Sequence, residues 1–291
     1  MNINEFCIYV SKLATKSLLY EVSAAPKPGL VDRKNPGAHR DMDFFTFLDS
    51  SVSLVDYFYK CTMAGIEFKE EDYKLLMEKI RPLGIEAEKS MFNATKGVNT
   101  HKGLIFSLGI ISAAAGNLYY INKEIYQSSI DICNLVKLIT KEITKELDNI
   151  EDKENLTYGE KLYLKYGVKG IRGEVESGFR TVLKYSLPIL KDLINKEIHI
   201  NHILIQVLLH LMAYSEDSNI LGRHDMQTLE FVKEKALTAL SHGGYLTSYG
   251  KVFVNEMDKY FIEKNISPGG SADLLAVTMM LYMLEHGDKL D

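Results

Sequence analysis

Residues 21–43 read EVSAAPKPGLVDRKNPGAHRDMD, and apolar segments with helical spacing flank this stretch on both sides. Pro26, Pro28 and Pro36 each fix φ and lack a backbone donor, so no helix can run through the stretch. A long loop of mixed charge is unusual inside a compact domain unless it has a function. We therefore interpret residues 21–43 as part of a functional site rather than as an ordinary surface connection.

The rest of the chain repeats apolar residues at helical spacing and lacks the alternating runs and tight turns of strands. The predicted helices cover 4–22, a segment from Asp41 or Asp43 to Gly65, 70–92 with a break near Pro82, 103–122, 125–147, a short helix capped by Thr157, 201–214, 226–241, 247–263 and a last helix ending near Glu285. Asp148–Asn155 is predicted to be a polar linker that tolerates insertion or motion. We expect an all-α, single-domain multi-helix bundle over residues 1–291, with its site built from polar loops at helix ends.

The stretch 103–122 has no charged residue and is almost long enough to span a membrane. It is rich in glycine, alanine and serine, which suits a tightly packed helix at the centre of a large helical protein. We favour the buried helix, because the chain has no second stretch of this kind.

The composition excludes several classes of protein. A net charge of -5 and a pI near 5.9 argue against a nucleic-acid or membrane-surface binder. Three scattered cysteines indicate neither a disulfide framework nor a zinc cluster. No basic region followed by an apolar run opens the sequence, so we expect a cytoplasmic protein without a signal peptide.

Five polar loops combine glycine with charged side chains, and most lead into an apolar helix: 26–43, 96–103, 169–178, 215–225 and 265–273. Helix N-termini favour anions, and glycine lets a phosphate approach the backbone. The basic candidates for a polyphosphate are Lys27, Arg40, Lys102, Arg172 and Arg223. The acidic candidates for Mg²⁺ are Asp32, Glu174, Glu176, Asp217 and Asp273.

Taken singly, these features have simpler explanations. Asp217 and Asp273 are typical of helix caps, and His101 of an ordinary loop histidine. Residues 97–103 are not a Walker motif, because the Gly-Lys-Ser/Thr order is missing. Glu21 is either a solvated helix end or a carboxylate at the mouth of the proline-rich loop, and we favour the second interpretation.

Six motifs in order along the chain resemble the triphosphoribosyl-dephospho-CoA synthase family. They are Glu21–Arg33, Gly37–Asp43, Gly97–Gly103, Arg172-Gly-Glu, Asp217-Ser-Asn and Ser267–Asp273. The resemblance implies a transferase that uses ATP and 3′-dephospho-CoA, releases adenine and makes the prosthetic-group precursor of citrate lyase. A close relative serves malonate decarboxylase. The run after Asp217 is less glycine-rich than in many relatives, which leaves the role of His224 open.

The resemblance also implies roles for the residues of the motifs. A direct displacement at the ribose carbon needs a base for the acceptor hydroxyl, an acid for adenine and charges for the triphosphate. We expect Glu21 or Glu174 to be the base and His101 a further catalytic residue. The expected substrate-binding residues are Lys27, Arg33, His39, Arg40, Lys102, Arg172, Arg223 and Ser271. The expected Mg²⁺ ligands are Asp32, Asp217 and Asp273.

Two other functions remain open from the sequence. One is a metal-dependent all-helical hydrolase of N-glycosidic bonds, and the other is an inactive nucleotide-binding module. In the favoured interpretation the product is passed on for transfer to an acyl carrier protein, with no nucleic-acid or membrane partner. The sequence does not decide between citrate lyase and malonate decarboxylase, or whether the chain forms a homo-oligomer.

Overall fold

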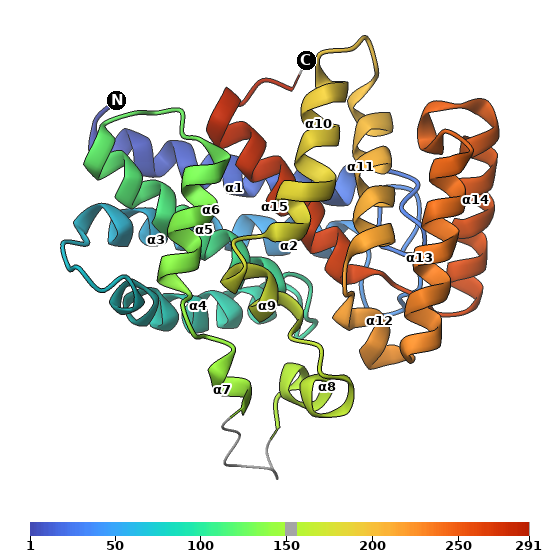
Figure 1. The fold of residues 1–291 in the computed structure, drawn as a ribbon, viewed down its shortest axis with the longest axis horizontal. Helices are drawn as coiled ribbons and strands as arrows, with labels where there is room; N and C mark the ends of the chain where they lie inside the picture. Colours follow the sequence, from blue (N-terminus) through green and yellow to red (C-terminus); the bar gives the residue numbers. More distant parts are fainter. Residues whose placement is uncertain (149–155, 291) are drawn as a thin grey trace. The chain divides into compact units, whose positions relative to one another are not determined.

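The computed structural model describes residues 1–148 and 156–290. Throughout these residues every regular element is a helix and none is a strand, which confirms the predicted all-helical class. The chain forms two compact units. Figure 1 shows the ribbon coloured along the sequence. The first unit comprises Met1–Ser23, Asp41–Lys141 and Ala276–Leu290, and the second comprises Ala24–Arg40 and Glu142–Leu275. The predicted linker at 148–155 lies outside the described residues, apart from Asp148, and the assignment of the chain to one domain stays a prediction.

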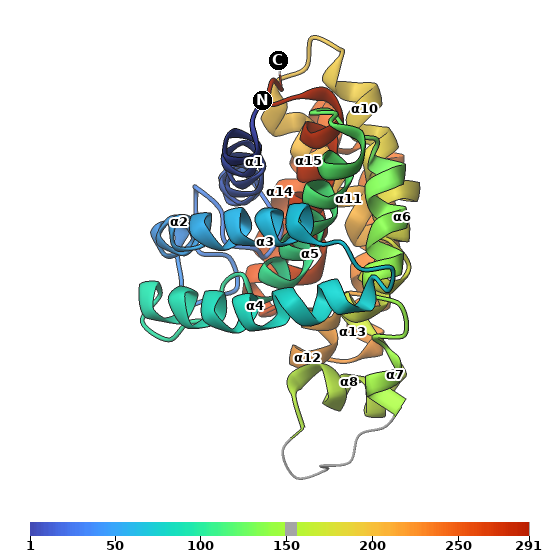
Figure 2. The same cartoon turned by 90° about the vertical axis from the view of Figure 1, so that its left-hand side faces the viewer.

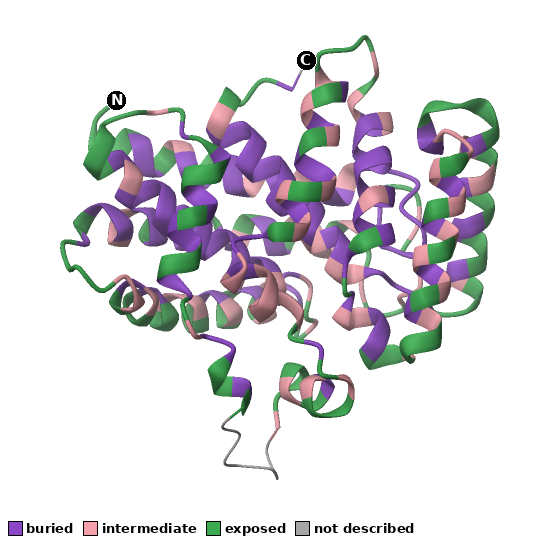
Figure 3. Ribbon diagram, in the orientation of Figure 1, coloured by how far each residue is buried: buried purple, intermediate pink, exposed green. Residues whose placement is uncertain are grey.

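The first unit is built around the apolar helix α5. Its helices are α1 (Ile3–Ser23), α2 (Phe44–Ser53), α3 (Val55–Glu67), α4 (Lys74–Ala94), α5 (Lys102–Asn122) and α6 (Ser129–Ile139). Figure 2 shows α3 lying between α1 and α4. α5 is long and apolar enough to cross a membrane, but 78% of its most apolar window is buried, in line with the predicted core helix. It is mostly purple, the colour of buried residues, in Figure 3.

Glycines at the contact between α3 and α5 explain how closely these two helices pack. A Cβ atom at Gly65 would overlap the Ala113 carbonyl oxygen, and one at Gly116 would overlap the Thr62 carbonyl oxygen. The backbones therefore approach at positions where only glycine fits. The side-chain amide of Asn117 donates to the Gly65 carbonyl oxygen at 3.1 Å, so this polar residue of α5 has a hydrogen-bond partner within the unit.

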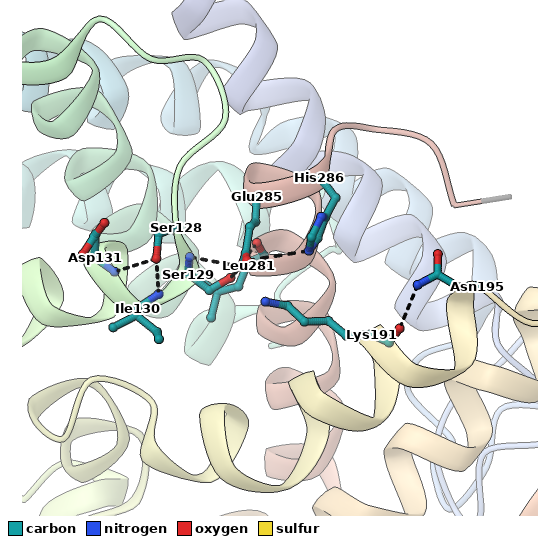
Figure 4. A network of polar contacts seen from close by, with 9 residues as sticks. All are labelled: Ser128, Ser129, Ile130, Asp131, Lys191, Asn195, Leu281, Glu285 and His286. Carbon is teal, nitrogen blue, oxygen red and sulfur yellow. Dashed lines mark hydrogen bonds and ion pairs between the residues drawn. The ribbon is translucent and has the colours of Figure 1, made fainter.

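The start of α6 is tied to the end of α15 (Gly269–His286) in the same unit (Figure 4). The Ser129 backbone N–H donates to Oε2 of Glu285 at 3.2 Å, and the Ser129 hydroxyl donates to the same oxygen. His286 lies 3.7 Å from the other Glu285 oxygen. The Ser128 hydroxyl accepts from Ile130 N–H at 3.2 Å, which caps α6.

The second unit contains the shorter helices and the proline-rich loop. Its helices are α7 (Lys145–Asp148), α8 (Tyr158–Tyr166), α9 (Gly170–Glu176), the π-helical turn η1 (Val182–Ser186), α10 (Leu187–Ile194), α11 (Ile200–Tyr214), α12 (Ser218–Arg223), α13 (Met226–Ser241), the 3₁₀ turn η2 (Gly244–Leu246) and α14 (Ser248–Glu263). α11 is its most buried helix. α15 (Gly269–His286) contributes its first residues to this unit and the rest to the first.

Several predicted helix ends are confirmed, and one predicted break is wrong. Asp43 caps α2 through a capping box with Thr46, and Thr157 caps α8 in the same way with Glu160. α4, however, continues through Pro82. Proline removes one donor there, but Pro82 lies on the exposed face, where water can bind the carbonyl it leaves unpaired. Buried residues on both sides of it hold the helix together.

Two other predicted helices differ from the structure. The helix expected from Asp43 to Gly65 is divided at Leu54 into α2 and α3. The helix expected over 125–147 is shorter, because α6 ends at Ile139 and only α7 follows. The run through η1 and α10 was not predicted, since a π-turn interrupts the 3.6-residue repeat on which the prediction depends.

Candidate active site

The proline-rich loop at 24–40 is buried over its first half, and three side chains satisfy its backbone. The side-chain amide of Asn201 accepts from Ala25 N–H at 2.9 Å and donates to the Ala25 carbonyl at 2.7 Å. Oδ2 of Asp32 accepts from Lys27 N–H at 2.9 Å. Since buried backbone groups need partners, these side chains fix the path of the loop.

Asp258 of α14 is the third side chain, and it is not among the residues predicted from the sequence. Its Oδ1 accepts from Gly29 N–H at 3.0 Å, and its Oδ2 accepts from the Asn35 side chain at 3.4 Å. Burial raises the pKa of Asp258, and the Asp32 charge adds to the rise, while the Gly29 bond opposes it. An acid on the apolar face of a helix, one residue after Met257, was the only available signal.

His39 connects this loop to two other polar loops of the unit. Its Nε2 lies 2.9 Å from the Ser267 hydroxyl, and its Nδ1 lies 3.2 Å from NH2 of Arg223. A guanidinium only donates, so Nδ1 is the acceptor in this contact and Nε2 carries the hydrogen toward Ser267. Arg223 also approaches the Ala38 carbonyl at 3.5 Å. The predicted substrate residues His39 and Arg223 are therefore neighbours.

The carboxylate of Asp217 accepts hydrogen bonds from the first turns of two helices, α12 and α15. Its Oδ1 accepts from Asn219 N–H at 3.0 Å and from Gly270 N–H at 3.1 Å. Its Oδ2 accepts from the backbone and the hydroxyl of Ser271 at 2.8 and 2.9 Å. Burial raises the pKa of Asp217, and its bonds to Ser271, Gly270 and Ile220 oppose the rise. The first donors of α15 are thus already occupied by a carboxylate, which limits the room there for a phosphate.

Four of the five predicted polar loops gather in the second unit. His39 joins the proline-rich loop to Ser267 and Arg223, and Asp217 joins α12 to α15. A Cβ atom at Gly170, where α9 begins, would lie 3.4 Å from the Ser218 side chain. The fifth loop, 96–103, belongs to the first unit.

Glu174 lies in α9, and only one of its two carboxyl oxygens accepts a hydrogen bond from the described residues. The Thr181 hydroxyl donates to its Oε1. Its Oε2 is buried and has no hydrogen-bond partner among the described residues. Burial raises the pKa of Glu174, and the nearby Glu216 charge adds to this, while Thr181 opposes it. The surroundings of this side chain therefore favour its neutral form more than water does.

The other predicted residues of this unit differ widely in exposure. Lys27 is 1% exposed, so its ammonium is a buried charge, whereas Arg33 and Arg40 are exposed. Arg172 lies 3.8 Å from Glu146. Asp273 is half-buried within α15. The basic residues predicted to contact phosphate therefore include both buried and exposed side chains.

Three predicted residues belong to the first unit. Glu21 is in the last turn of α1 and is only 2% exposed, so the alternative of a solvated helix end is wrong. His101 is buried directly before α5, and its Nδ1 lies 2.7 Å from the Ser50 hydroxyl. Lys102 is exposed and pairs with Glu88 at 2.9 Å.

The predicted metal ligands lack the arrangement that an all-protein Mg²⁺ site needs, as far as the described residues show. Asp32 already accepts from three backbone N–H groups, of Lys27, Lys34 and Asn35, at 2.9, 2.6 and 3.1 Å. Among the described residues, no group of three or more His, Cys, Asp or Glu side chains is arranged to hold a metal ion. The residues therefore do not fit an all-protein magnesium site, and the roles of Asp32, Asp217 and Asp273 as ligands stay predictions.

Asn201 and Asp258 support the proline-rich loop, and neither was predicted from the sequence. Each of these residues lies in a helix, and the loop residue that it binds is more than 170 positions away in the chain. A buried polar side chain among apolar neighbours was the one available signal, and it does not identify the partner. Two of the five predicted polar loops are helical in the structure, since 169–178 contains α9 and 215–225 contains α12. The proline-rich loop was predictable, whereas the side chains that hold it were not.

Comparison with known proteins gives one consistent result. Residues 7–291 match the family model described as ATP:dephospho-CoA triphosphoribosyl transferase. The chain is 41% identical to a probable 2-(5''-triphosphoribosyl)-3'-dephosphocoenzyme-A synthase of Streptococcus mutans serotype c, covering 98% of this chain and 99% of the relative. It is 37% identical to the 2-(5''-triphosphoribosyl)-3'-dephosphocoenzyme-A synthase of Escherichia fergusonii, with 96% and 92% covered. No solved structure matches. The chain belongs to the ATP:dephospho-CoA triphosphoribosyl transferase family.

Proposed function

We propose that this chain joins the ribose C1 of ATP to the 2′-hydroxyl of 3′-dephospho-CoA and releases adenine. The observation that carries this proposal is the family match over residues 7–291. The match includes all five polar loops, and therefore every basic and acidic side chain selected from the sequence. The gathering of four of these loops in one unit supports a common site for them.

The experiment is a product count with the purified protein. ATP, Mg²⁺ and 3′-dephospho-CoA are incubated with it, and chromatography measures adenine and the triphosphoribosylated product. We expect a one-to-one ratio. ADP, AMP or pyrophosphate as the main product would contradict the proposal. Adenine formed equally well without 3′-dephospho-CoA would favour the N-glycosidic hydrolase instead.

Mg²⁺ belongs to the proposal as a companion of ATP. Magnesium usually keeps several waters and binds through one or two carboxylates plus substrate phosphates. In this mode a single remaining lone pair of a carboxylate is sufficient, and Oδ2 of Asp32 accepts only the Lys27 N–H among the described residues. Isothermal titration of ATP with and without Mg²⁺ tests it, and tight Mg²⁺ binding without ATP would contradict it.

The proposed product is the precursor of the prosthetic group of citrate lyase, to be transferred to an acyl carrier protein. Service to malonate decarboxylase is the alternative. The reaction uses soluble substrates, and we propose that it takes place in the cytoplasm. Incubation of the product with each purified carrier protein and its transferase distinguishes the two lyase systems.

A further inference from the structure

We propose that Tyr185, Tyr214 and Glu174 form the subsite for the adenine of ATP. In this subsite the base stacks on Tyr214, which is itself stacked on Tyr185, and Glu174 gives its proton to adenine as it departs. The inference rests on the proposed function, and it assigns to Glu174 the role of acid rather than that of base.

The two tyrosines form a flat aromatic surface at the end of α11. Their ring centroids are 4.0 Å apart and the rings are inclined by only 10°. Tyr214 is the last residue of α11 and is 43% exposed, while Tyr185 lies behind it in the π-helical turn η1. A purine stacks well on an exposed aromatic ring, and Tyr185 holds Tyr214 in place for this.

Glu174 is connected to both elements that carry the rings. Thr181, which donates to Glu174, is the residue directly before the π-helical turn that carries Tyr185. Glu216 follows Tyr214 by two residues, and its charge acts on Glu174. Tyr185 itself lies within the π-helical turn that begins directly after Thr181, and such turns are frequent at functional sites.

The carboxyl of Glu174 is suited to donate a proton. Its Oε1 accepts from Thr181, whereas its buried Oε2 has no partner among the described residues. A protonated carboxyl has one O–H to offer, and the unpaired oxygen is the natural place for it. Burial favours this neutral form, and the Glu216 charge favours it further, as the raised pKa of Glu174 indicates.

The basic groups on α9 and beside it are directed to other acids. Arg172 pairs with Glu146 at 3.8 Å, and Lys169 approaches Glu176 at 4.0 Å. No ion pair to Glu174 is present among the described residues. A cation beside Glu174 would stabilise its ionised form, so this distribution of charge fits an acid.

The proton balance of the step is simple. The bond between ribose C1′ and N9 breaks, and its electron pair moves into the imidazole ring of adenine. Glu174 transfers its proton to N7, so adenine leaves as a neutral molecule. The 2′-oxygen of 3′-dephospho-CoA forms the new bond to C1′ and gives up its own proton to a separate base. One proton is gained and one is lost.

The test compares ATP with N7-methyl-ATP in Glu174→Gln. N7-methyladenine leaves without a proton, so the variant should lose about 10²–10⁴-fold in kcat with ATP but only a few-fold with the methylated substrate. Glu230→Gln, an exposed glutamate paired with Lys233, is the matched control and should behave as the wild type. Equal losses of Glu174→Gln on both substrates would overturn the proposal, because a structural defect does not depend on the leaving group.

Two measurements test the subsite apart from Glu174. Tyr214→Ala should raise the KM for ATP about tenfold and leave the KM for 3′-dephospho-CoA unchanged, and Tyr214→Phe should restore it. In the wild type, 7-deaza-ATP, which cannot take a proton at that position, should bind as ATP does but release no base. A higher KM for 3′-dephospho-CoA in Tyr214→Ala, or rapid turnover of 7-deaza-ATP, would overturn the proposal.

Failure of this inference is distinguishable from failure of the proposed function. If the wild type forms no adenine from ATP and 3′-dephospho-CoA, the proposed function is wrong. If the wild type forms it and Glu174→Gln is equally fast with ATP, only the role of Glu174 is wrong. Because the 7-deaza-ATP measurement uses the wild-type protein, it also holds if a variant does not fold.

Discussion

The backbone N–H and the hydroxyl of Ser271 both donate to one carboxylate oxygen of Asp217, at 2.8 and 2.9 Å. The other oxygen accepts from Gly270 at 3.1 Å and from the first turn of α12. One side chain thus fixes the starts of two helices that are more than fifty residues apart. This geometry favours the capping interpretation of Asp217, whatever further role the residue has.

Asp217→Asn should therefore lower the free energy of unfolding by about 2–4 kcal/mol. The amide nitrogen of asparagine would face the Ser271 donors, leaving buried polar groups unpaired. Urea unfolding measures the loss, and turnover with ATP and Mg²⁺ is recorded in parallel. Asp225→Asn is the control, since Asp225 caps α13 at the surface and asparagine caps equally well there. A loss as small as that of the control would contradict the double cap.

Gly29 holds the proline-rich loop against Ile266, which lies three residues beyond the end of α14. Its φ is +72°, and a Cβ atom there would overlap the Ile266 carbonyl oxygen. We expect Gly29→Ala to cost about 3 kcal/mol or more, because both the conformation and the contact oppose a side chain. At Gly97 φ is +90°, but no atom lies within 4 Å of an added Cβ atom. Gly97→Ala therefore meets only the unfavourable backbone conformation and should cost about 1 kcal/mol. Equal unfolding midpoints for the two variants would show that the contact at Ile266 is unimportant.

Most helices and the proline-rich loop could be predicted because they depend on local sequence, whereas the short helices α9 and α12 were predicted as polar loops. Asp43 and Thr157 were recognisable as caps, and the three prolines excluded a helix around Lys27. Partnerships across the chain could not be predicted in the same way. That Asp258 binds Gly29, or that Asn201 binds Ala25, depends on which helices pack together, and no periodicity carries that information. For the same reason Pro82 was misjudged, since only its exposure makes it harmless.

His101 is held in one tautomer by a chain of hydroxyl groups. The Thr100 hydroxyl donates to Ser50 Oγ at 2.7 Å, so the Ser50 hydroxyl has its own hydrogen left for Nδ1 of His101. The neutral ring therefore carries its hydrogen on Nε2. Nitrogen-15 chemical shifts of the imidazole should show this form at neutral pH.

Ser50→Ala should cost about 1–3 kcal/mol, because it leaves the buried Nδ1 of His101 without its donor. Ser53→Ala removes a hydroxyl that bonds only to the Ser50 carbonyl oxygen and is the matched control. We expect the control to change stability by less than about 0.5 kcal/mol. An unchanged nitrogen spectrum in Ser50→Ala would refute the assigned tautomer.

Asp258 should make the stability of the protein depend on pH in an unusual direction. Its pKa is raised from the ordinary 3.8, chiefly by burial, so the folded state holds this proton more tightly than the unfolded state. Stability from this group is thus fully present below about pH 4 and is lost as pH rises through the folded pKa. The unfolding free energy of the wild type minus that of Asp258→Asn, measured in urea from pH 3 to 8, should fall over that window and then level off. A difference that rises with pH would mean that the Gly29 and Asn35 bonds outweigh burial.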